Sequence, residues 1–161
     1  MSIMNRHPSK PAEVQPTEEN TACIIVAYRP DHGFCSLVSS LLGQASAIVI
    51  VNNGPREYMD SCLTDIDDRN TGITLLQNSR NMGLGFALNQ GVERCIEQGY
   101  HWALLLDQDT EVDPGIIKNL CGVCAGISPL PAVLGANYRD ASTGDPLVSC
   151  NGPETGPVRR K

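Results

Sequence analysis

Short apolar, β-rich runs alternate with segments of helical periodicity along this chain, and this alternation limits the possible fold more than any other feature. Continuous apolar runs at residues 22–28 and 47–51 predict two strands that are buried on both faces. Shorter runs at residues 73–77 and 102–106 predict two more strands, and residues 132–136 predict a fifth. Proline and glycine clusters separate these runs from the neighbouring segments.

The segments between the strands repeat their apolar residues at the spacing of a helix. Helices are predicted over residues 34–42 and 84–99, with a weaker one over residues 57–66. A further helix is expected to start with Asp113 as its N-cap and Pro114 at the first helical position. Strands that alternate with helices indicate βαβ units, and therefore an α/β fold with a mainly parallel sheet.

The length of 161 residues fits a single domain. Residues 1–20 carry prolines and charges without periodicity, and we expect them to be a flexible tail. Residues 21–140 contain the strands and helices and form the predicted domain. Residues 141–161 are expected to be loop or irregular tail.

The composition excludes several classes of protein. The net charge of −6 and the aromatic share of 4% disfavour nucleic-acid binding, because an acidic surface repels phosphate backbones. Seven cysteines without regular spacing, and no secretory signal, favour free thiols in a reducing cytoplasm. No apolar run approaches the length of a transmembrane helix.

Polar residues follow each predicted strand at the point where it ends. They are Tyr28-Arg29, Asn52-Asn53, Gln77-Asn78 and Asp107-Gln108-Asp109. Right-handed crossovers bring the carboxyl ends of parallel strands to one edge of a sheet, where ligands of such folds bind. The sequence therefore predicts a ligand site at this edge.

The motif Asp107-Gln108-Asp109 (a D-x-D motif) has two interpretations. Residues i and i+2 of a strand point to the same side, so both carboxylates would grip a hard divalent cation and leave positions for phosphate oxygens. Alternatively, Asp109 caps a turn and Asp107 is solvated at the strand end. Taken alone, the motif does not separate the two.

Two further groups have the right chemistry for a nucleotide. Glycines at Gly83 and Gly85 open a predicted helix, which lets backbone N–H groups approach an anion, although close packing of helix on sheet explains them as well. The amides of Asn52 and Asn53 suit a base or ribose edge, but an ordinary turn uses the same residues. Tyr28 is placed to pack against a base and Arg80 to neutralise phosphate; both residue types are also common at surfaces.

Four stretches in this order resemble the inverting family 2 glycosyltransferases of the GT-A fold, a three-layer, Rossmann-like architecture. The resemblance covers roughly residues 22–139, and the Asp-Gln-Asp form is similar to that of the bacterial rhamnosyltransferases. The matching stretches are residues 24–30, 50–54, 81–91 and 104–110.

The resemblance implies roles for individual residues. Tyr28 and Asn53 would contact the base, and Asn52 stands where relatives usually carry Asp. Asn89 and the turn at residues 83–85 would line the diphosphate and sugar. Asp107 would face the ribose or sugar and help to hold the metal, and Asp109 would ligate Mg²⁺ or Mn²⁺.

The implied function is transfer of a sugar from a nucleotide-diphosphate sugar, such as dTDP-rhamnose, to a cell-surface polysaccharide or lipid-linked acceptor. A lipid-linked acceptor would bring the chain to a membrane surface. In relatives the catalytic base lies beyond the point where this sequence stops, so the chain resembles a C-terminally incomplete, donor-binding part with no assigned catalytic residue. The alternative is a non-catalytic remnant that binds nucleotide or self-associates as a homo-oligomer.

Overall fold

The computed structural model describes residues 13–63, 72–136, 138–139, 143 and 146–147. The chain divides into two compact units, residues 1–130 and residues 131–161, and each is described by itself. The predicted tail falls outside the described residues up to residue 12, as do the end of the weak helix from residue 64 and the final segment from residue 148.

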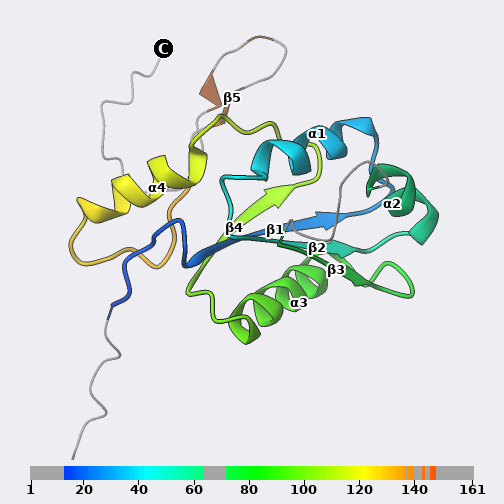
Figure 1. The fold of residues 1–161 in the computed structure, drawn as a ribbon, viewed down its shortest axis with the longest axis horizontal. Helices are drawn as coiled ribbons and strands as arrows, with labels where there is room; N and C mark the ends of the chain where they lie inside the picture. The colour runs from blue at the N-terminus through cyan, green and yellow to red at the C-terminus, as the bar shows by residue number, and fades with distance from the viewer. Residues whose placement is uncertain (1–12, 64–71, 137, 140–142, 144–145, 148–161) are drawn as a thin grey trace, which may run out of the picture. The chain divides into compact units, whose positions relative to one another are not determined.

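The first unit is built on a four-stranded, all-parallel sheet (Figure 1). Its strand order is β3-β2-β1-β4, so the chain adds strands on one side of β1 and then returns to the other side. This arrangement confirms the predicted α/β fold with its parallel sheet. The strands are β1 (Thr21–Ala27), β2 (Ala47–Asn52), β3 (Ile73–Gln77) and β4 (Trp102–Asp107).

Helices cover both faces of this sheet, which gives three layers. Helices α1 (His32–Leu41) and α2 (Arg56–Leu63) lie on one face, and α3 (Leu84–Glu97) lies on the other (Figure 1). The change of face follows from the strand order, because a right-handed crossover from β3 back to β4 must pass on the opposite side. Helix α4 (Ile116–Ala125) adds the buried side chain of Ile117 to the layer that contains α1.

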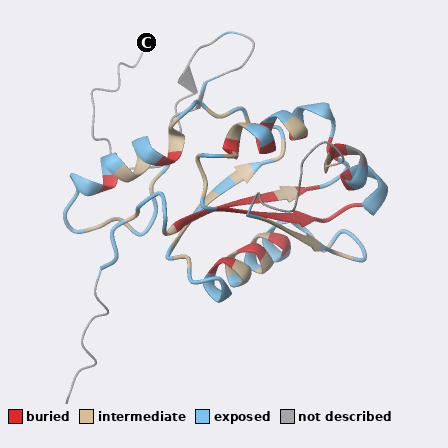
Figure 2. Ribbon diagram, in the orientation of Figure 1, coloured by how far each residue is buried: buried red, intermediate tan, exposed pale blue. Residues whose placement is uncertain are grey.

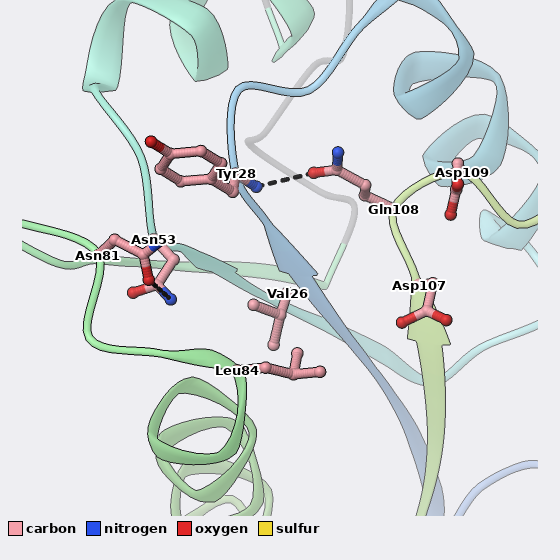
Figure 3. A pocket seen from close by; sticks show the side chains of 8 residues that line it. All are labelled: Val26, Tyr28, Asn53, Asn81, Leu84, Asp107, Gln108 and Asp109. Carbon is pink, nitrogen blue, oxygen red and sulfur yellow. Dashed lines mark hydrogen bonds between the residues drawn. The ribbon is translucent and has the colours of Figure 1, made fainter.

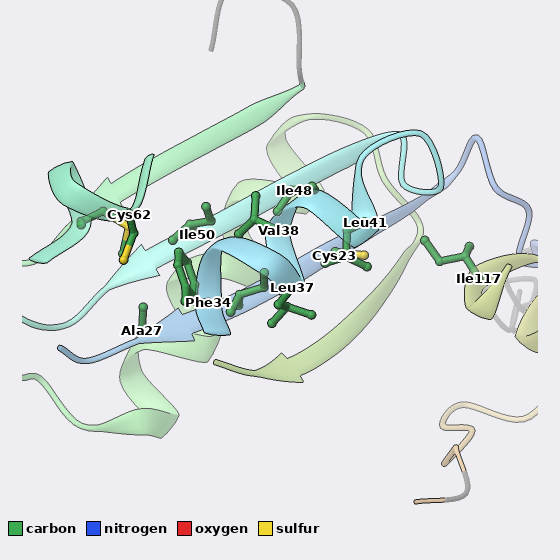
Figure 4. Close-up of a cluster of buried hydrophobic side chains, with 12 residues drawn as sticks. Cys23, Ala27, Phe34, Leu37, Val38, Leu41, Ile48, Ile50, Cys62 and Ile117 are labelled. Carbon is green, nitrogen blue, oxygen red and sulfur yellow. The ribbon is translucent and has the colours of Figure 1, made fainter. Parts of the chain in front are cut away.

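The core lies where β1 and β2 are covered from both sides (Figure 2). On one face, Phe34 of α1 packs with Ile25 and Ile50 of the sheet in a cluster that α2 completes (Figure 4). On the other face, α3 packs its small residues Ala87 and Cys95 against alternate residues of the same two strands. The continuous apolar runs of β1 and β2 are therefore explained by burial on both faces.

Gly91 allows α3 to approach β1 closely. A Cβ atom at this position would lie 2.5 Å from Cγ2 of Ile24, whose side chain is fully buried. We expect Gly91→Ala to lower the free energy of unfolding by about 1–2 kcal/mol, because overpacking outweighs the better helix propensity of alanine. Chemical denaturation measures this change, and an unchanged or higher stability would contradict the close packing. Gly122→Ala in α4 is the control, because its added Cβ meets nothing within 4 Å.

The start of α4 differs from the prediction. The helix begins at Ile116, its N-cap is Gly115 with φ 79°, and Asp113 supplies only a backbone carbonyl to a turn. The side-chain oxygen of Gln44, just past α1, instead accepts the N–H groups of Gly115 and Ile116 at 2.6 and 3.1 Å. The predicted Asp113 cap is wrong because a distant side chain takes that role.

Two other segments also differ from the sequence expectations. Residues 132–136 form no strand, and Val133 is 84% exposed, so this apolar run is not a fifth strand of the sheet. In the second unit, β5 (Tyr138–Arg139) instead pairs in antiparallel fashion with β6 (Pro146–Leu147). Within the described residues, no helix is long and apolar enough to cross a membrane.

The described part of the N-terminal segment is attached to the first unit. The indole N–H of Trp102 donates to the carbonyl of Val14 at 2.8 Å, and the hydroxyl of Ser46 donates to that of Glu18 at 2.7 Å. The carbonyl of Asn20 accepts from the backbone N–H of Trp102. Residues 14–20 therefore lie against the amino ends of β2 and β4, although their composition resembles that of a tail.

Candidate functional site

A pocket of about 420 Å³ opens beyond the carboxyl ends of β1, β2 and β4 (Figure 3). It lies where the strand order reverses, because the chain leaves β1 toward one face of the sheet and enters β4 from the other. Open α/β sheets bind ligands at this point. The lining residues are Val26, Tyr28, Asn53, Asn81, Leu84, Asp107, Gln108 and Asp109.

Gln108 joins the carboxyl ends of β1 and β4 beside this pocket. Its side-chain oxygen accepts the backbone N–H of Tyr28 at 2.7 Å, just past the last paired residues of β1 and β4 (Figure 3). This hydrogen bond links the backbone of Tyr28, which follows β1, to the turn after β4 that contains Asp107 and Asp109. The sequence placed Gln108 at this edge but gave it no role, because that role depends on a contact across 80 positions of the chain.

Tyr28 presents an aromatic surface at the rim of the pocket. Its side chain is 43% exposed, and the guanidinium of Arg29 lies 5.3 Å from the ring centroid. Arg29 has a φ of 51° in the left-handed region, an uncommon conformation that clusters at functional sites. The backbone of Gly54 packs closely against Tyr28 and Arg29: a Cβ at Gly54 would lie 3.4 Å from Cδ2 of Tyr28 and 3.0 Å from the backbone nitrogen of Arg29.

Asp107 and Asp109 occupy the acidic side of the pocket. Strand β4 ends at Asp107, and the N–H of Thr110 donates to the Asp107 carbonyl at 3.2 Å, so Asp109 lies in a turn. The sequence argument that residues i and i+2 of a strand point to the same side therefore does not apply to Asp107 and Asp109. Both residues are exposed, and within the described part of the chain neither carboxylate forms a hydrogen bond or ion pair.

The acidic pair fits a hard divalent cation only with help from a ligand. Among the described residues, no three histidine, cysteine, aspartate or glutamate side chains gather into a metal-binding group. Two carboxylates leave most positions of Mg²⁺ or Mn²⁺ to water and phosphate oxygens, which is how Mg²⁺ is commonly bound beside nucleotides. The donor set therefore suits a cation that arrives with a diphosphate.

The glycines that open α3 lie next to the pocket, although they are not among its lining residues. Gly83 is the N-cap with φ 85° and ψ 154°, and no side chain caps the helix. A Cβ at Gly83 or Gly85 would meet nothing within 4 Å, so these glycines are not required by packing. The helix start thus keeps its first backbone N–H groups for other partners.

The other predicted residues lie in different environments. Asn52 is fully buried, and Asn53 is 3% exposed but borders the pocket. Arg80 and Asn89 are exposed and are not among the lining residues. Of the residues expected to hold the donor and metal, the structure brings Tyr28, Asn53 and the two aspartates to one pocket.

Comparison with known proteins identifies the family. The profile of the family described as glycosyl transferase family 2 matches residues 22–123, which is more than half of the chain. The chain belongs to glycosyl transferase family 2. The match runs from β1 into α4, so it includes every residue that lines the family 2 pocket.

One relative of this family 2 chain is the dTDP-rhamnosyl transferase RfbF of Shigella flexneri. The two are 28% identical over 102 residues, which is 63% of this chain and 33% of the relative. The aligned part therefore spans about a third of the relative's length. The family predicted from the four motifs is confirmed.

Proposed function

We propose that the pocket binds the nucleotide-diphosphate part of a sugar donor, with a dTDP-sugar such as dTDP-rhamnose as the donor class. The observation that carries this proposal is the pocket itself. An exposed aromatic ring and two carboxylates line it, and the uncapped start of α3 lies next to it. All of them lie where the strand order of the sheet reverses. The name of the Shigella relative supports the choice of donor.

A diphosphate needs positive charge in this acidic chain of net charge −6. We propose that Asp107 and Asp109 hold Mg²⁺ or Mn²⁺, which would offset the negative charge of the leaving diphosphate. The backbone N–H groups at the start of α3 add the partial positive charge of a helix N-terminus. Arg80 and Asn89, on either side of that start, are proposed to reach the phosphates and sugar from the rim.

Tyr28 is proposed to pack against the base, and Gln108 to keep Tyr28 in place through its backbone N–H. For Asn52 and Asn53 the burial favours an indirect role over a direct contact with the base. We assign no general base, because the acids that line the pocket in the described part of the chain are the two proposed metal ligands.

The wider reaction is proposed to be transfer of the sugar to a glycan or lipid-linked acceptor. A lipid-linked acceptor would place the chain at a membrane surface, on the cytoplasmic side. The cysteines support a reducing compartment, because the six that the structure describes form no disulfide bond with one another.

Titration calorimetry with two nucleotides tests the proposed donor site. In Mn²⁺, dTDP is expected to bind about 10-fold or more tightly than dTMP, because only the diphosphate bridges the metal and the start of α3. Removing the metal with EDTA is expected to abolish most of this preference. Equal affinities for dTDP and dTMP in Mn²⁺ would reject a diphosphate site.

The alternative is a non-catalytic chain that binds nucleotide or self-associates. Its support is the outer edge of β4, which pairs with no strand among the described residues, together with two exposed leucines: Leu105 of β4 is 49% and Leu84 of α3 is 56% exposed. Transfer of rhamnose from dTDP-rhamnose to a lipid-linked acceptor by this chain would reject the alternative. Dimerisation in analytical ultracentrifugation, without turnover, would favour it.

A further inference from the structure

Asn53 is the most fully engaged side chain next to the pocket. It is 3% exposed, and its amide nitrogen donates to Oδ1 of Asn81 at 3.0 Å and to the carbonyl of Gly83 at 3.3 Å. Its amide oxygen accepts the side-chain N–H of Asn78 at 3.1 Å and the backbone N–H of Met82 at 3.0 Å. Both donors and both acceptor positions of this amide are therefore in use.

A ligand could bond to this amide only if one of those four bonds were broken. Breaking one would separate a donor or acceptor of residues 78–83 from its partner in a partly buried bond, which costs free energy. Asn53 is thus poorly suited to read a base directly, although it borders the pocket.

The partners of Asn53 all belong to the loop that leads from β3 into α3. Oδ1 of Asn81 also accepts the N–H of Gly83 at 2.9 Å, and Asn78 exchanges two hydrogen bonds with Gln90 at 2.8 and 3.1 Å. The loop is therefore held at its centre by Asn53 and tied to the body of α3 through Gln90. It ends at Gly83, whose φ of 85° and ψ of 154° set the direction in which the helix begins.

We propose that Asn53 is a positioning residue, which fixes residues 78–83 so that the start of α3 is already oriented for the diphosphate. This inference rests on the proposed function, because it gives the helix start its ligand. Its physical basis is preorganisation: a loop that is ordered before binding loses less conformational entropy when the ligand arrives. The effect on affinity passes through the loop and requires no contact between Asn53 and the nucleotide.

Gln77, whose side-chain amide also forms several hydrogen bonds near Asn53, provides a matched control. Nε2 of Gln77 donates to the carbonyls of Gly54 and Asn78 at 3.0 and 2.7 Å, and its Oε1 accepts from Asn52 at 2.8 Å. Gln77 lies at the end of β3 and does not line the pocket. Gln77→Ala therefore removes a similar number of hydrogen bonds without touching Met82 or Gly83.

The test measures amide hydrogen exchange and dTDP affinity in Asn53→Ala and Gln77→Ala. In Asn53→Ala we expect exchange at Met82 and Gly83 to rise about 10-fold more than global unfolding accounts for, and dTDP affinity in Mn²⁺ to fall about 10-fold. Gln77→Ala is expected to match the wild type in both after the same correction. If Asn53→Ala does not fold, Asn78→Ser is measured instead, with the same direction and a smaller change.

Two results would overturn the positioning role. One is unchanged exchange at Met82 and Gly83 in Asn53→Ala. The other is lost affinity without faster exchange, which would mean that Asn53 contacts the nucleotide directly. If the wild type binds no dTDP, the proposed donor site fails, and the exchange measurement still decides whether Asn53 fixes the loop.

Discussion

Replacing Asp109 by alanine is expected to weaken dTDP binding in Mn²⁺ by about 100-fold, since a direct ligand should matter at least as much as the groups that support one. The carboxylate of Asp109 lies in the turn after β4 and lines the pocket. With few protein groups for a cation, the loss of one carboxylate leaves Asp107 alone to hold it. Affinity measured in EDTA should change little, because no metal is bound there.

Asp113→Ala is the control for this prediction. Asp113 is also exposed and lies four residues along the same loop, but it does not line the pocket. The substitution removes the same charge, so any general electrostatic effect on an anionic ligand appears equally in both variants. If Asp109→Ala and Asp113→Ala bind dTDP in Mn²⁺ with the same affinity, Asp109 is not a metal ligand.

Replacing Phe34 by alanine is expected to lower the free energy of unfolding by about 3–5 kcal/mol. Phe34 is fully buried in α1 and belongs to the cluster that joins this helix to β1, β2 and α2 (Figure 4). Removing the ring leaves a cavity in a layer that the parallel sheet cannot readily close. Urea denaturation followed by circular dichroism measures the change.

The other phenylalanine of the chain provides a matched control. Phe86 lies in the first turn of α3 and is 49% exposed. Phe86→Ala removes the same atoms from a site that is half in water, and we expect a change within about 0.5 kcal/mol. Similar losses in the two variants would contradict the burial of Phe34 between α1 and the sheet.

The sheet was predictable because its strands are marked by burial on both faces. The runs at β1 and β2 contain only residues that suit such a strand, and β3 was predicted with its observed bounds, Ile73–Gln77. The convergence of polar residues at one edge follows from parallel strands, so the place of the pocket was also predictable. The start of α4 was not, because Gln44 caps it across 71 residues.

In the candidate site, too, features that depend on local sequence were predictable and those that depend on distant contacts were not. Sequence reasoning placed Tyr28 and the two aspartates correctly at the strand ends. It also placed Asn53 at this edge, and Asn53 lines the pocket, but a sequence does not show that four groups of a distant loop occupy its amide. It gave Gln108 no role for the same reason, since the bond to Tyr28 exists only after β1 and β4 pair.

Paramagnetic broadening by Mn²⁺ shows where the metal binds and therefore tests the proposed metal-assisted diphosphate site. In ¹H–¹⁵N spectra recorded with dTDP, substoichiometric Mn²⁺ is predicted to broaden the amide signals of Tyr28 and of residues 107–110 first, and to do so more strongly than without dTDP. Signals from α2, which carries Glu57 and Asp60 but no lining residue of the pocket, should broaden less. Broadening centred on α2, or broadening at the pocket that dTDP does not increase, would contradict a metal-assisted diphosphate site.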